Sequence, residues 1–291
     1  MNKRILVTGA NGQLGKTFQV IAKNSVHQFV FATSKDLNIS CESAVKDFFK
    51  TKGDFDVVIN CAAYTKVDLA EDEQEKALLV NATAVNYLLN ALSPETTFIH
   101  YSTDYVFNGK GYQPYKETDE TDPINFYGHS KLEGEKIINN HKHKKSYIIR
   151  TSWVYSPFGV NFVKTMLRLT KTKEEIKVVC DQIGSPTYTF DLANFTLDCL
   201  INGNPLKPTI YNYSNQGVCS WYDFASEVIT STSSRTDVNP ILSKDFQTKA
   251  QRPFYSVLSK QKLVTDYLEL KIPYWRNSLN DCLELIRKLK E

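Results

Sequence analysis

The chain has 291 residues, of which 42% are hydrophobic and 23% charged, the balance of a folded globular protein rather than a disordered or collagen-like one. Lysine and arginine number 35 against 32 acidic residues, and a net charge of +3 is too small and too dispersed to predict binding to nucleic acid or to an anionic membrane. At about 150 residues per domain, this length predicts two domains.

The N-terminal half alternates short β-branched runs with stretches of helical periodicity, which is typical of βαβ units around a parallel sheet. The expected strands are Arg4–Val7, Gln28–Ala32, Asp56–Asn60, Thr97–Tyr101 and Tyr147–Arg150. The expected helices between them are Gln13–Lys23, Glu42–Lys50, Glu73–Leu92 and Tyr127–Asn139. Because such crossovers are right-handed, this order predicts an α/β fold with a doubly wound parallel (Rossmann) sheet over residues 1–150.

After residue 150 the pattern loosens and proline and glycine interrupt it more often, which is typical of a smaller, loop-rich lobe. Short strands are expected at Val178–Val179 and Ile210–Tyr213, and helices at Phe162–Leu169, Leu192–Ile201 and Trp221–Ile229. We therefore expect residues 151–291 to form mainly a substrate-binding α/β lobe, with a soft boundary and some segments returning to the first domain.

No apolar run approaches the roughly eighteen residues of a membrane-spanning helix, and Ile5–Val7 is too short for the core of a signal peptide. We therefore expect a cytoplasmic protein. The six cysteines are scattered, without a C-x-x-C pair or a histidine beside them at metal-ligand spacing. This arrangement predicts reduced, mostly buried thiols and no metal site.

Three glycines at three-residue spacing, Gly9, Gly12 and Gly15, follow the first expected strand and open the first helix. Glycines at such a turn allow a tight bend, close approach of the backbone to a pyrophosphate and close packing of helix on strand. The phosphates would bind at the positive N-terminus of the helix. The pattern therefore predicts a dinucleotide site, with a purely structural turn as the alternative.

The second strand is expected to end near Thr33, where NAD-specific sites commonly carry an acidic residue for the ribose 2′-hydroxyl. This chain instead has Ser34 and Lys35, a hydroxyl and a cation that suit a 2′-phosphate. We therefore predict NADPH as the preferred cofactor, with NADH as the second choice. Asp36 lies close by and weakens this inference, and the alternative is that Lys35 is a plain surface lysine.

Tyr127 and Lys131 form a Y-x-x-x-K pattern at the start of an expected helix. Residues four apart share a helix face, so we expect the ammonium near the phenol, lowering the tyrosine pKa from about 10 towards the working pH. Tyr127 would then be a general acid or base. Upstream, Thr103 or Ser102 is expected to hydrogen-bond a reacting oxygen, because the fourth strand ends there, at the sheet edge where ligands bind.

These features stand in the order and spacing of extended short-chain dehydrogenases/reductases, and the chain more narrowly resembles the family of dTDP-4-dehydrorhamnose reductases. The resemblance covers nearly the whole chain, and STDYVF, SWVY and DQIGSPT are more specific than the tyrosine and lysine pair. Its eight ordered blocks are Thr8–Gly15, Asn60–Glu71, Val80–Leu88, His100–Gly109, Tyr127–Glu135, Arg150–Leu169, Asp181–Tyr188 and Arg252–Leu258.

The resemblance implies transfer of a hydride from NAD(P)H to C4 of dTDP-4-dehydro-β-L-rhamnose, which gives dTDP-β-L-rhamnose in dTDP-rhamnose biosynthesis. It implies that Tyr127 protonates the nascent C4 oxygen and that Thr103 hydrogen-bonds the same oxygen. It also implies that Lys131 lowers the Tyr127 pKa and binds the nicotinamide ribose.

Further contacts follow from matching the remaining family positions. The expected cofactor contacts are Gly9, Gly12, Gln13, Leu14, Ser34, Lys35, Asn38, Ile39, Ala62, Ala63, Tyr64, Tyr101, Tyr127 and Lys131. The expected sugar contacts are Val67, Thr103, Asp104 and Trp153. Relatives often carry an acid where this chain has Asn38, so hydrogen bonding to the adenine is left open. The Trp153 indole suits the apolar face of a deoxysugar, with core packing as the alternative.

Other functions on the same fold remain open at this point. Within the superfamily these are a nucleotide-sugar 4-epimerase, a 4,6-dehydratase or a reductase of another 4-keto sugar, although the glutamate that a dehydratase needs is missing after Asp104. Outside catalysis, some relatives are NADP-binding regulatory subunits, which retention of Thr103, Tyr127 and Lys131 disfavours. Some relatives also pair through Mg²⁺ held by glutamates. No matching glutamate cluster is found here, so Mg²⁺ dependence and a homodimer are left open.

Overall fold

A computed structural model describes residues 2–143, 145–202, 209–232 and 234–289. Its centre is a six-stranded sheet in the order β10-β5-β4-β3-β1-β2, in which every neighbouring pair is parallel. The strands are β1 (Arg4–Thr8), β2 (Gln28–Ala32), β3 (Val57–Asn60), β4 (Thr97–Thr103), β5 (Ser146–Thr151) and β10 (Ile210–Asn212). The predicted doubly wound parallel sheet is confirmed.

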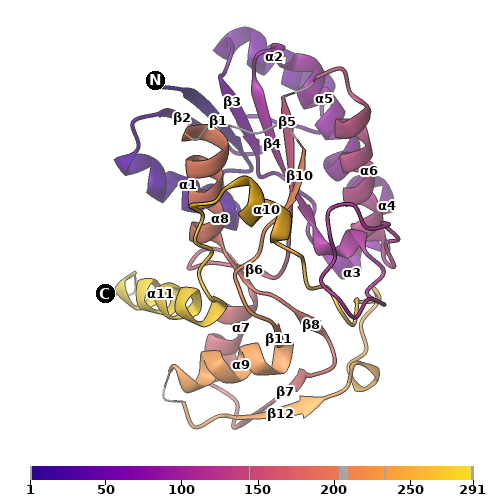
Figure 1. The fold of residues 1–291 in the computed structure, drawn as a ribbon, viewed down its shortest axis with the longest axis vertical. Coiled ribbons are helices and arrows are strands. Elements are labelled where there is room, and N and C mark those ends of the chain that lie inside the picture. The colour runs from indigo at the N-terminus through magenta and orange to yellow at the C-terminus, as the bar shows by residue number, and fades with distance from the viewer. Residues whose placement is uncertain (1, 144, 203–208, 233, 290–291) are drawn as a thin grey trace.

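Helices cover both faces of this sheet, and each face has its own apolar core (Figure 1). On one face pack α1 (Gln13–Ile21), α8 (Thr189–Phe195) and α10 (Gln261–Asp266). The opposite face of the sheet is covered by α2 (Glu42–Lys52), α5 (Ala84–Ala91) and α6 (Phe126–Asn140). Side chains of successive strand residues therefore alternate between two buried faces, which is why the strands read as nearly continuous apolar runs.

A smaller lobe lies beyond the carboxyl edge of the sheet, below it in Figure 1. It has three two-stranded pairings, β6 (Val154–Tyr155) with β9 (Thr187–Tyr188), β8 (Ile183–Gly184) with β11 (Cys219–Ser220), and β7 (Glu175–Val179) with β12 (Asp237–Ile241). Its helices are α7 (Phe162–Leu169), α9 (Trp221–Thr230) and α11 (Trp275–Lys288). These helices and strands share an aromatic-rich core that includes Phe224 and Trp275.

The chain crosses between the two parts more than once. After the smaller lobe begins, α8 returns to pack beside α1, where the Thr17 and Thr189 hydroxyls lie 2.7 Å apart, and β10 pairs with β5. A division of the chain into domains at residue 150 therefore stays a prediction. No helix in the described ranges is long and apolar enough to cross a membrane.

Most of the expected elements are present, with ends shifted by one to three residues. The single helix expected over Glu73–Leu92 is present with each end shifted by one residue: α4 (Gln74–Leu78) continues into a π-helical turn at Leu79–Thr83 and then into α5. The short α3 (Val67–Ala70) precedes it. Similarly, Leu192–Ile201 divides into α8 and a π-helical segment at Thr196–Asn202. Helix α11 and the two-residue strands were not expected, because α11 follows a loop-rich stretch and strands that short have no periodicity.

Candidate active site

The glycine turn between β1 and α1 has the close contacts expected of it. Gly9 has a left-handed φ of 62°, and a Cβ there would lie 2.6 Å from the Ala62 nitrogen. A Cβ at Gly15 would lie 2.5 Å from the Gly9 oxygen, so both positions require glycine. Helix α1 begins after Gly12 with no side-chain cap. Its first amide groups are thus available to an anion, and the turn fits the pyrophosphate of a dinucleotide.

The two residues after Gly12 use their side chains elsewhere. The Gln13 Oε1 accepts hydrogen bonds from Ser156 Oγ at 2.9 Å and from Asn161 Nδ2 at 2.8 Å, which joins the turn to the smaller lobe. Leu14 packs against the core between β1 and α8. If Gln13 and Leu14 line a pyrophosphate as expected, their backbone amide groups would make the contacts, because their side chains bind elsewhere.

The segment after β2 places two candidate cofactor residues, Ser34 and Lys35, on the surface. Asp36, which complicated the expectation, folds back on the turn: its Oδ2 accepts from the Thr33 backbone at 2.9 Å and from the Thr33 hydroxyl at 2.6 Å. This carboxylate therefore closes the turn. Further on, the side chain of Ile39 is buried in the core, whereas Asn38 is exposed.

Asn81, which the sequence analysis missed, fixes the loop after β3, where Ala62, Ala63 and Tyr64 follow the strand. Its Oδ1 accepts from the Tyr64 backbone nitrogen at 2.8 Å, and its Nδ2 donates to the Tyr64 carbonyl at 3.0 Å and to Ser130 Oγ at 2.9 Å. Asn81 lies in the π-helical turn that divides the expected long helix. Such turns often occur at functional sites, and Asn81 lies in the Val80–Leu88 block that carries the family resemblance.

Tyr127 sits in the first turn of α6, whose N-cap Asn125 accepts from the Gly128 backbone at 2.8 Å. Loss of water around the phenol raises the Tyr127 pKa to about 12, partly opposed by a hydrogen bond with Thr103. The expectation that Lys131 lowers this pKa is therefore wrong for this structure. The reason is geometric, because the lysine nitrogen is bound to other partners.

Lys131 is fully buried and faces β4 rather than the phenol. Its Nζ donates to the Tyr101 carbonyl at 2.6 Å and lies 3.1 Å from His100 Nε2. Burial lowers the Lys131 pKa to about 8, partly opposed by the Glu135 carboxylate. The side chain of Tyr101 lies on the opposite face of the sheet, where its hydroxyl is 2.8 Å from Thr196 Oγ1, so its contribution to this site is its carbonyl.

At the end of β4, Thr103 and Asp104 are both buried. The Thr103 hydroxyl donates to Asp104 Oδ1 at 3.0 Å. Burial raises the Asp104 pKa to about 7, although the Ser256 and Thr103 hydroxyls oppose it. Asp104 Oδ2 has no regular hydrogen bond to any described residue. A buried carboxyl oxygen without a partner is an acceptor available to a ligand, which agrees with the expected sugar contact.

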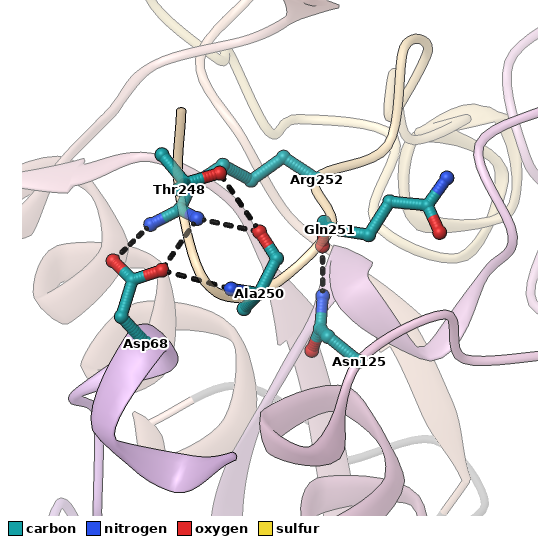
Figure 2. A network of polar contacts seen from close by, with 6 residues as sticks. All are labelled: Asp68, Asn125, Thr248, Ala250, Gln251 and Arg252. Carbon is teal, nitrogen blue, oxygen red and sulfur yellow. Dashed lines mark hydrogen bonds and ion pairs between the residues drawn. The ribbon is translucent and has the colours of Figure 1, made fainter. Parts of the chain in front are cut away.

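A segment from the C-terminal part, residues 248–252, crosses over the beginning of α3 and α6 (Figure 2). Arg252 donates from Nη1 and Nη2 to the two Asp68 carboxylate oxygens at 2.9 and 2.7 Å. This bidentate pairing lowers the Asp68 pKa to about 2. Asn125 Nδ2 donates to the Gln251 carbonyl at 2.8 Å, so the crossing segment is bound both beside Val67 and at the N-cap that precedes Tyr127.

Trp153 packs more tightly than the expectation of a free indole face allowed. Its ring stacks on Trp221 with centroids 3.6 Å apart and planes 10° from parallel. A Cβ at Gly184 would lie 2.6–2.9 Å from three atoms of the same indole. The backbone of Trp153 has a left-handed φ of 48°, which is rare for a bulky residue and is held here by this packing. A sugar contact at Trp153 therefore depends on the ring edge or on rearrangement of the stack.

The remaining expectations concern cysteines and metals. All six cysteines are free, and Cys61, beside the cofactor loop, has its pKa raised by burial. Among the described residues, no group of three or more His, Cys, Asp and Glu side chains could hold a metal ion.

Comparison with known proteins gives a consistent result. Residues 3–288 match the family described as RmlD substrate binding domain. The chain is 42% identical over 284 residues to the spore coat polysaccharide biosynthesis protein SpsK of Bacillus subtilis, covering 97% of each chain. A dTDP-4-dehydrorhamnose reductase crystal structure from Clostridium acetobutylicum is similar with a TM-score of 0.90 and 40% identity, over 98% of this chain and 99% of that one. That of the Bacillus anthracis dTDP-4-dehydrorhamnose reductase in complex with NADP has a TM-score of 0.92 and 38% identity, over 98% and 100%.

Proposed function

The chain belongs to the family of the RmlD substrate binding domain, and we propose that it reduces the C4 keto group of dTDP-4-dehydro-β-L-rhamnose to dTDP-β-L-rhamnose with NADPH, in dTDP-rhamnose biosynthesis. The similar reductases from Clostridium acetobutylicum and Bacillus anthracis support this substrate and this oxidoreductase chemistry. The observation that carries the proposal is that Tyr127 and Lys131 of α6 both contact the end of β4, the phenol at Thr103 and the ammonium at the Tyr101 carbonyl. The same sheet holds the uncapped glycine turn at the end of β1.

The reduced nicotinamide supplies the hydride when it is bound. The protein must supply a proton to the C4 oxygen, and a phenol with a pKa of about 12 is protonated throughout the neutral range. Tyr127 therefore carries the proton that the reaction needs. The phenol O–H breaks as the sugar O–H forms, and the tyrosine is reprotonated before the next turnover.

Thr103 and Lys131 assist the same proton transfer. The Thr103 hydroxyl, which donates to Asp104 Oδ1 in this structure, would turn its one proton to the C4 oxygen as charge develops there. Lys131, held at the Tyr101 carbonyl, would bind the nicotinamide ribose and so orient the cofactor next to the phenol.

On the sugar side, the proposal assigns Asp104 as a hydrogen-bonding group, because its Oδ2 is buried without a regular partner. Val67 begins α3 directly before the Asp68 and Arg252 pair, so its place beside the sugar is maintained by the crossing segment. Trp153 would contact the deoxysugar by the edge of its ring. The NADP of the Bacillus anthracis relative supports a preference for NADPH, with exposed Lys35 as the candidate partner of the 2′-phosphate.

The test is to supply purified protein with dTDP-4-dehydrorhamnose and NADPH, to follow the loss of NADPH absorbance and to identify the sugar by NMR. Tyr127→Phe removes only the phenol hydroxyl and should lower kcat by about 10²–10⁴. Tyr112→Phe, on a side chain that is 88% exposed, is the matched control and should leave kcat unchanged. An unchanged rate in Tyr127→Phe contradicts the catalytic assignment.

Three other outcomes would identify a different function. A sugar product without net oxidation of NADPH would indicate an epimerase, and turnover of another 4-keto sugar alone would indicate a different reductase. Binding of NADPH without turnover would indicate a regulatory subunit. Activity unaffected by chelators would exclude Mg²⁺ dependence, and light scattering would show whether the chain forms the homodimer that the sequence leaves open.

A further inference from the structure

A line of fully buried polar side chains runs beneath the proposed site, across three strands of the sheet. Thr8 Oγ1 is 2.6 Å from Asn60 Oδ1, Asn60 Nδ2 is 3.0 Å from His100 Nδ1, and His100 Nε2 is 3.1 Å from Lys131 Nζ. None of these four side chains is more than 2% exposed. The line begins directly before the glycine turn and ends at the lysine of the proposed site.

The register of the sheet explains why these side chains meet. Thr8 pairs with Asn60 across β1 and β3, and Asn60 pairs with His100 across β3 and β4. Residues paired in parallel strands point to the same face. His100 therefore points to the face that α6 covers, where Lys131 reaches it, whereas its neighbour Tyr101 points to the opposite face.

Counting donors shows what His100 does for the lysine. An ammonium group has three N–H donors and no acceptor. The Tyr101 carbonyl takes one donor of Lys131, and His100 Nε2 takes a second when the ring proton is on Nδ1. One donor is left, so the imidazole limits the direction in which Lys131 can bind a cofactor hydroxyl.

His100 can partner Lys131 in either protonation state of the lysine. Burial and the Lys131 charge keep the His100 pKa well below 6.5, so the ring is neutral and carries one N–H. Beside an ammonium, Nε2 must accept, Nδ1 carries the proton, and Asn60 turns its oxygen to the ring. Beside a neutral amine, Nε2 carries the proton and donates to Lys131, Nδ1 accepts from the Asn60 amide, and Asn60 accepts from Thr8. Both arrangements keep the three links between side chains.

Few charged groups act on this pair. From α6, the Glu135 carboxylate raises the Lys131 pKa, and it is itself held by Arg150 of β5, whose Nη2 is 2.7 Å from Glu135 Oε2. From β3 and β1 the line presents only the uncharged Asn60 and Thr8. The charge of Lys131 is therefore the main charge that acts on the His100 ring, so a change in that charge should alter the protonation of the ring nitrogens.

We propose that His100 is a positioning residue for Lys131, which, with Asn60 and Thr8 behind it, orients the lysine towards the cofactor and exchanges its ring proton between Nδ1 and Nε2 when the lysine titrates. The proposal deepens the proposed reductase function and rests on it for the role of Lys131. Its evidence is the set of contacts along the buried line.

The first experiment uses the unmodified protein with ¹⁵N-labelled histidine. NMR of the His100 ring should show Nδ1 and Nε2 exchanging their protonated and unprotonated shifts as the pH passes through about 8, without formation of imidazolium. A ring with the same tautomer from about pH 6 to pH 10 would overturn the proposed exchange. This measurement does not depend on sugar turnover.

The second experiment measures NADPH binding and the kinetic constants of His100→Phe. Loss of a hydrogen bond to a charged group should raise the Kd of NADPH by about tenfold or more and lower kcat, with the KM of the sugar unchanged. His100→Gln returns an amide near the former Nε2 and should recover much of the binding. A Kd within twofold of the unmodified protein in His100→Phe would overturn the positioning role.

His27→Phe is the matched control, because His27 is a second buried histidine bonded through both ring nitrogens. Its Nδ1 accepts from Lys3 N at 3.2 Å and its Nε2 is 2.7 Å from Asn202 Oδ1, beside the start of β2. This variant should leave the Kd of NADPH and the His100 shifts unchanged. If the unmodified protein binds NADPH but does not reduce the sugar, the proposed function fails while the binding and NMR results still judge His100.

Discussion

The carboxyl edge of the central sheet and the smaller lobe are held together by different kinds of contact. At the sheet edge, buried polar atoms are paired in strand register, as in Thr8, Asn60 and His100. In the smaller lobe, where most strands are only two residues long, stacked and tilted rings such as Trp153, Trp221 and Phe162 hold the elements together. Hydrogen-bonded register fixes positions closely, whereas ring packing tolerates rearrangement.

This difference matches what each region would have to do. The proton donor Tyr127 and the lysine Lys131 must keep fixed positions relative to the substrate, and a hydrogen-bonded sheet edge holds them there. A lobe that receives a nucleotide sugar benefits from an adjustable wall. Arg252 and Asp68 connect the two regions, because their ion pair binds the crossing segment to α3.

The largest predicted effect tests the rigidity of the sheet region. Glu135→Gln leaves the buried Arg150 guanidinium without its carboxylate, and the free energy of unfolding should fall by about 3–5 kcal/mol in urea titrations. The control is Glu42→Gln, which removes an exposed partner of Lys46 and should cost well under about 1 kcal/mol. Equal losses in the two variants would show that the sheet edge is no more dependent on paired charge than the surface.

The second prediction concerns Asp104, where the two regions meet. Its folded pKa of about 7 lies above its usual 3.8, so the folded chain binds more protons than the unfolded chain between these values. This group therefore lowers stability as pH rises from about 4 to 7, by up to about 4 kcal/mol. Asp104→Asn abolishes that loss, and its stability relative to the unmodified protein should rise over this range in thermal or urea unfolding.

Asp36→Asn is the control of opposite sign for this pH series. Hydrogen bonds from Thr33 lower the Asp36 pKa, so its carboxylate contributes stability above its unfolded pKa that is lost as pH falls through the folded pKa. The substitution should therefore destabilise the protein at neutral pH and have less effect in acid. A parallel pH trend for the two variants would contradict the assignment at Asp104.

The third prediction disturbs the aromatic wall of the smaller lobe. Gly184→Ala places a methyl group against the Trp153 indole, and overpacking of this kind costs about 1–3 kcal/mol. The near-ultraviolet circular dichroism of the stacked indoles should change and the KM of the sugar should rise, with the Kd of NADPH unaltered. Val218→Ala, at a half-exposed position of the same lobe, should change none of these, and an altered NADPH Kd in Gly184→Ala would break the separation of the two regions.

The smallest effect is expected at the exposed rim of the sheet region. Lys35→Ala should raise the KM of NADPH by about fivefold, the value of one exposed ionic contact, while the KM of NADH stays the same. Lys23→Ala removes another exposed lysine and serves as the control. Equal changes for NADPH and NADH in Lys35→Ala would remove Lys35 from the 2′-phosphate site.

Much of the sheet region was predictable because its signals are local. Alternation of strand and helix indicated the parallel sheet, and the spacing of Gly9 and Gly15 indicated a turn whose packing is confirmed. The spacing of Tyr127 and Lys131 correctly placed both on α6. The π-helical turn that holds Asn81 was missed because helical periodicity in the sequence continues on both sides of it.

The smaller lobe and the electrostatics of the site were not predictable in the same way. Asp68 and Arg252 are 184 positions apart, and no local period relates them. Trp153 was interpreted as a sugar platform, and only the folded chain brings Trp221 and Gly184 against its ring. These contacts depend on loops whose paths are set by the packing of the whole lobe.

By itself, then, the sequence determined the fold class, the glycine turn and the residue types of the proposed site, because strand and helix periodicity act over short distances. The tertiary structure decided the surroundings of Tyr127 and the partners of Lys131. Spacing alone indicated a lysine that lowers the tyrosine pKa. In the folded chain, loss of water raises the Tyr127 pKa to about 12, and Lys131 contacts His100 and the Tyr101 carbonyl. Removal of water is a property of the folded interior, and no pattern along the chain specifies it.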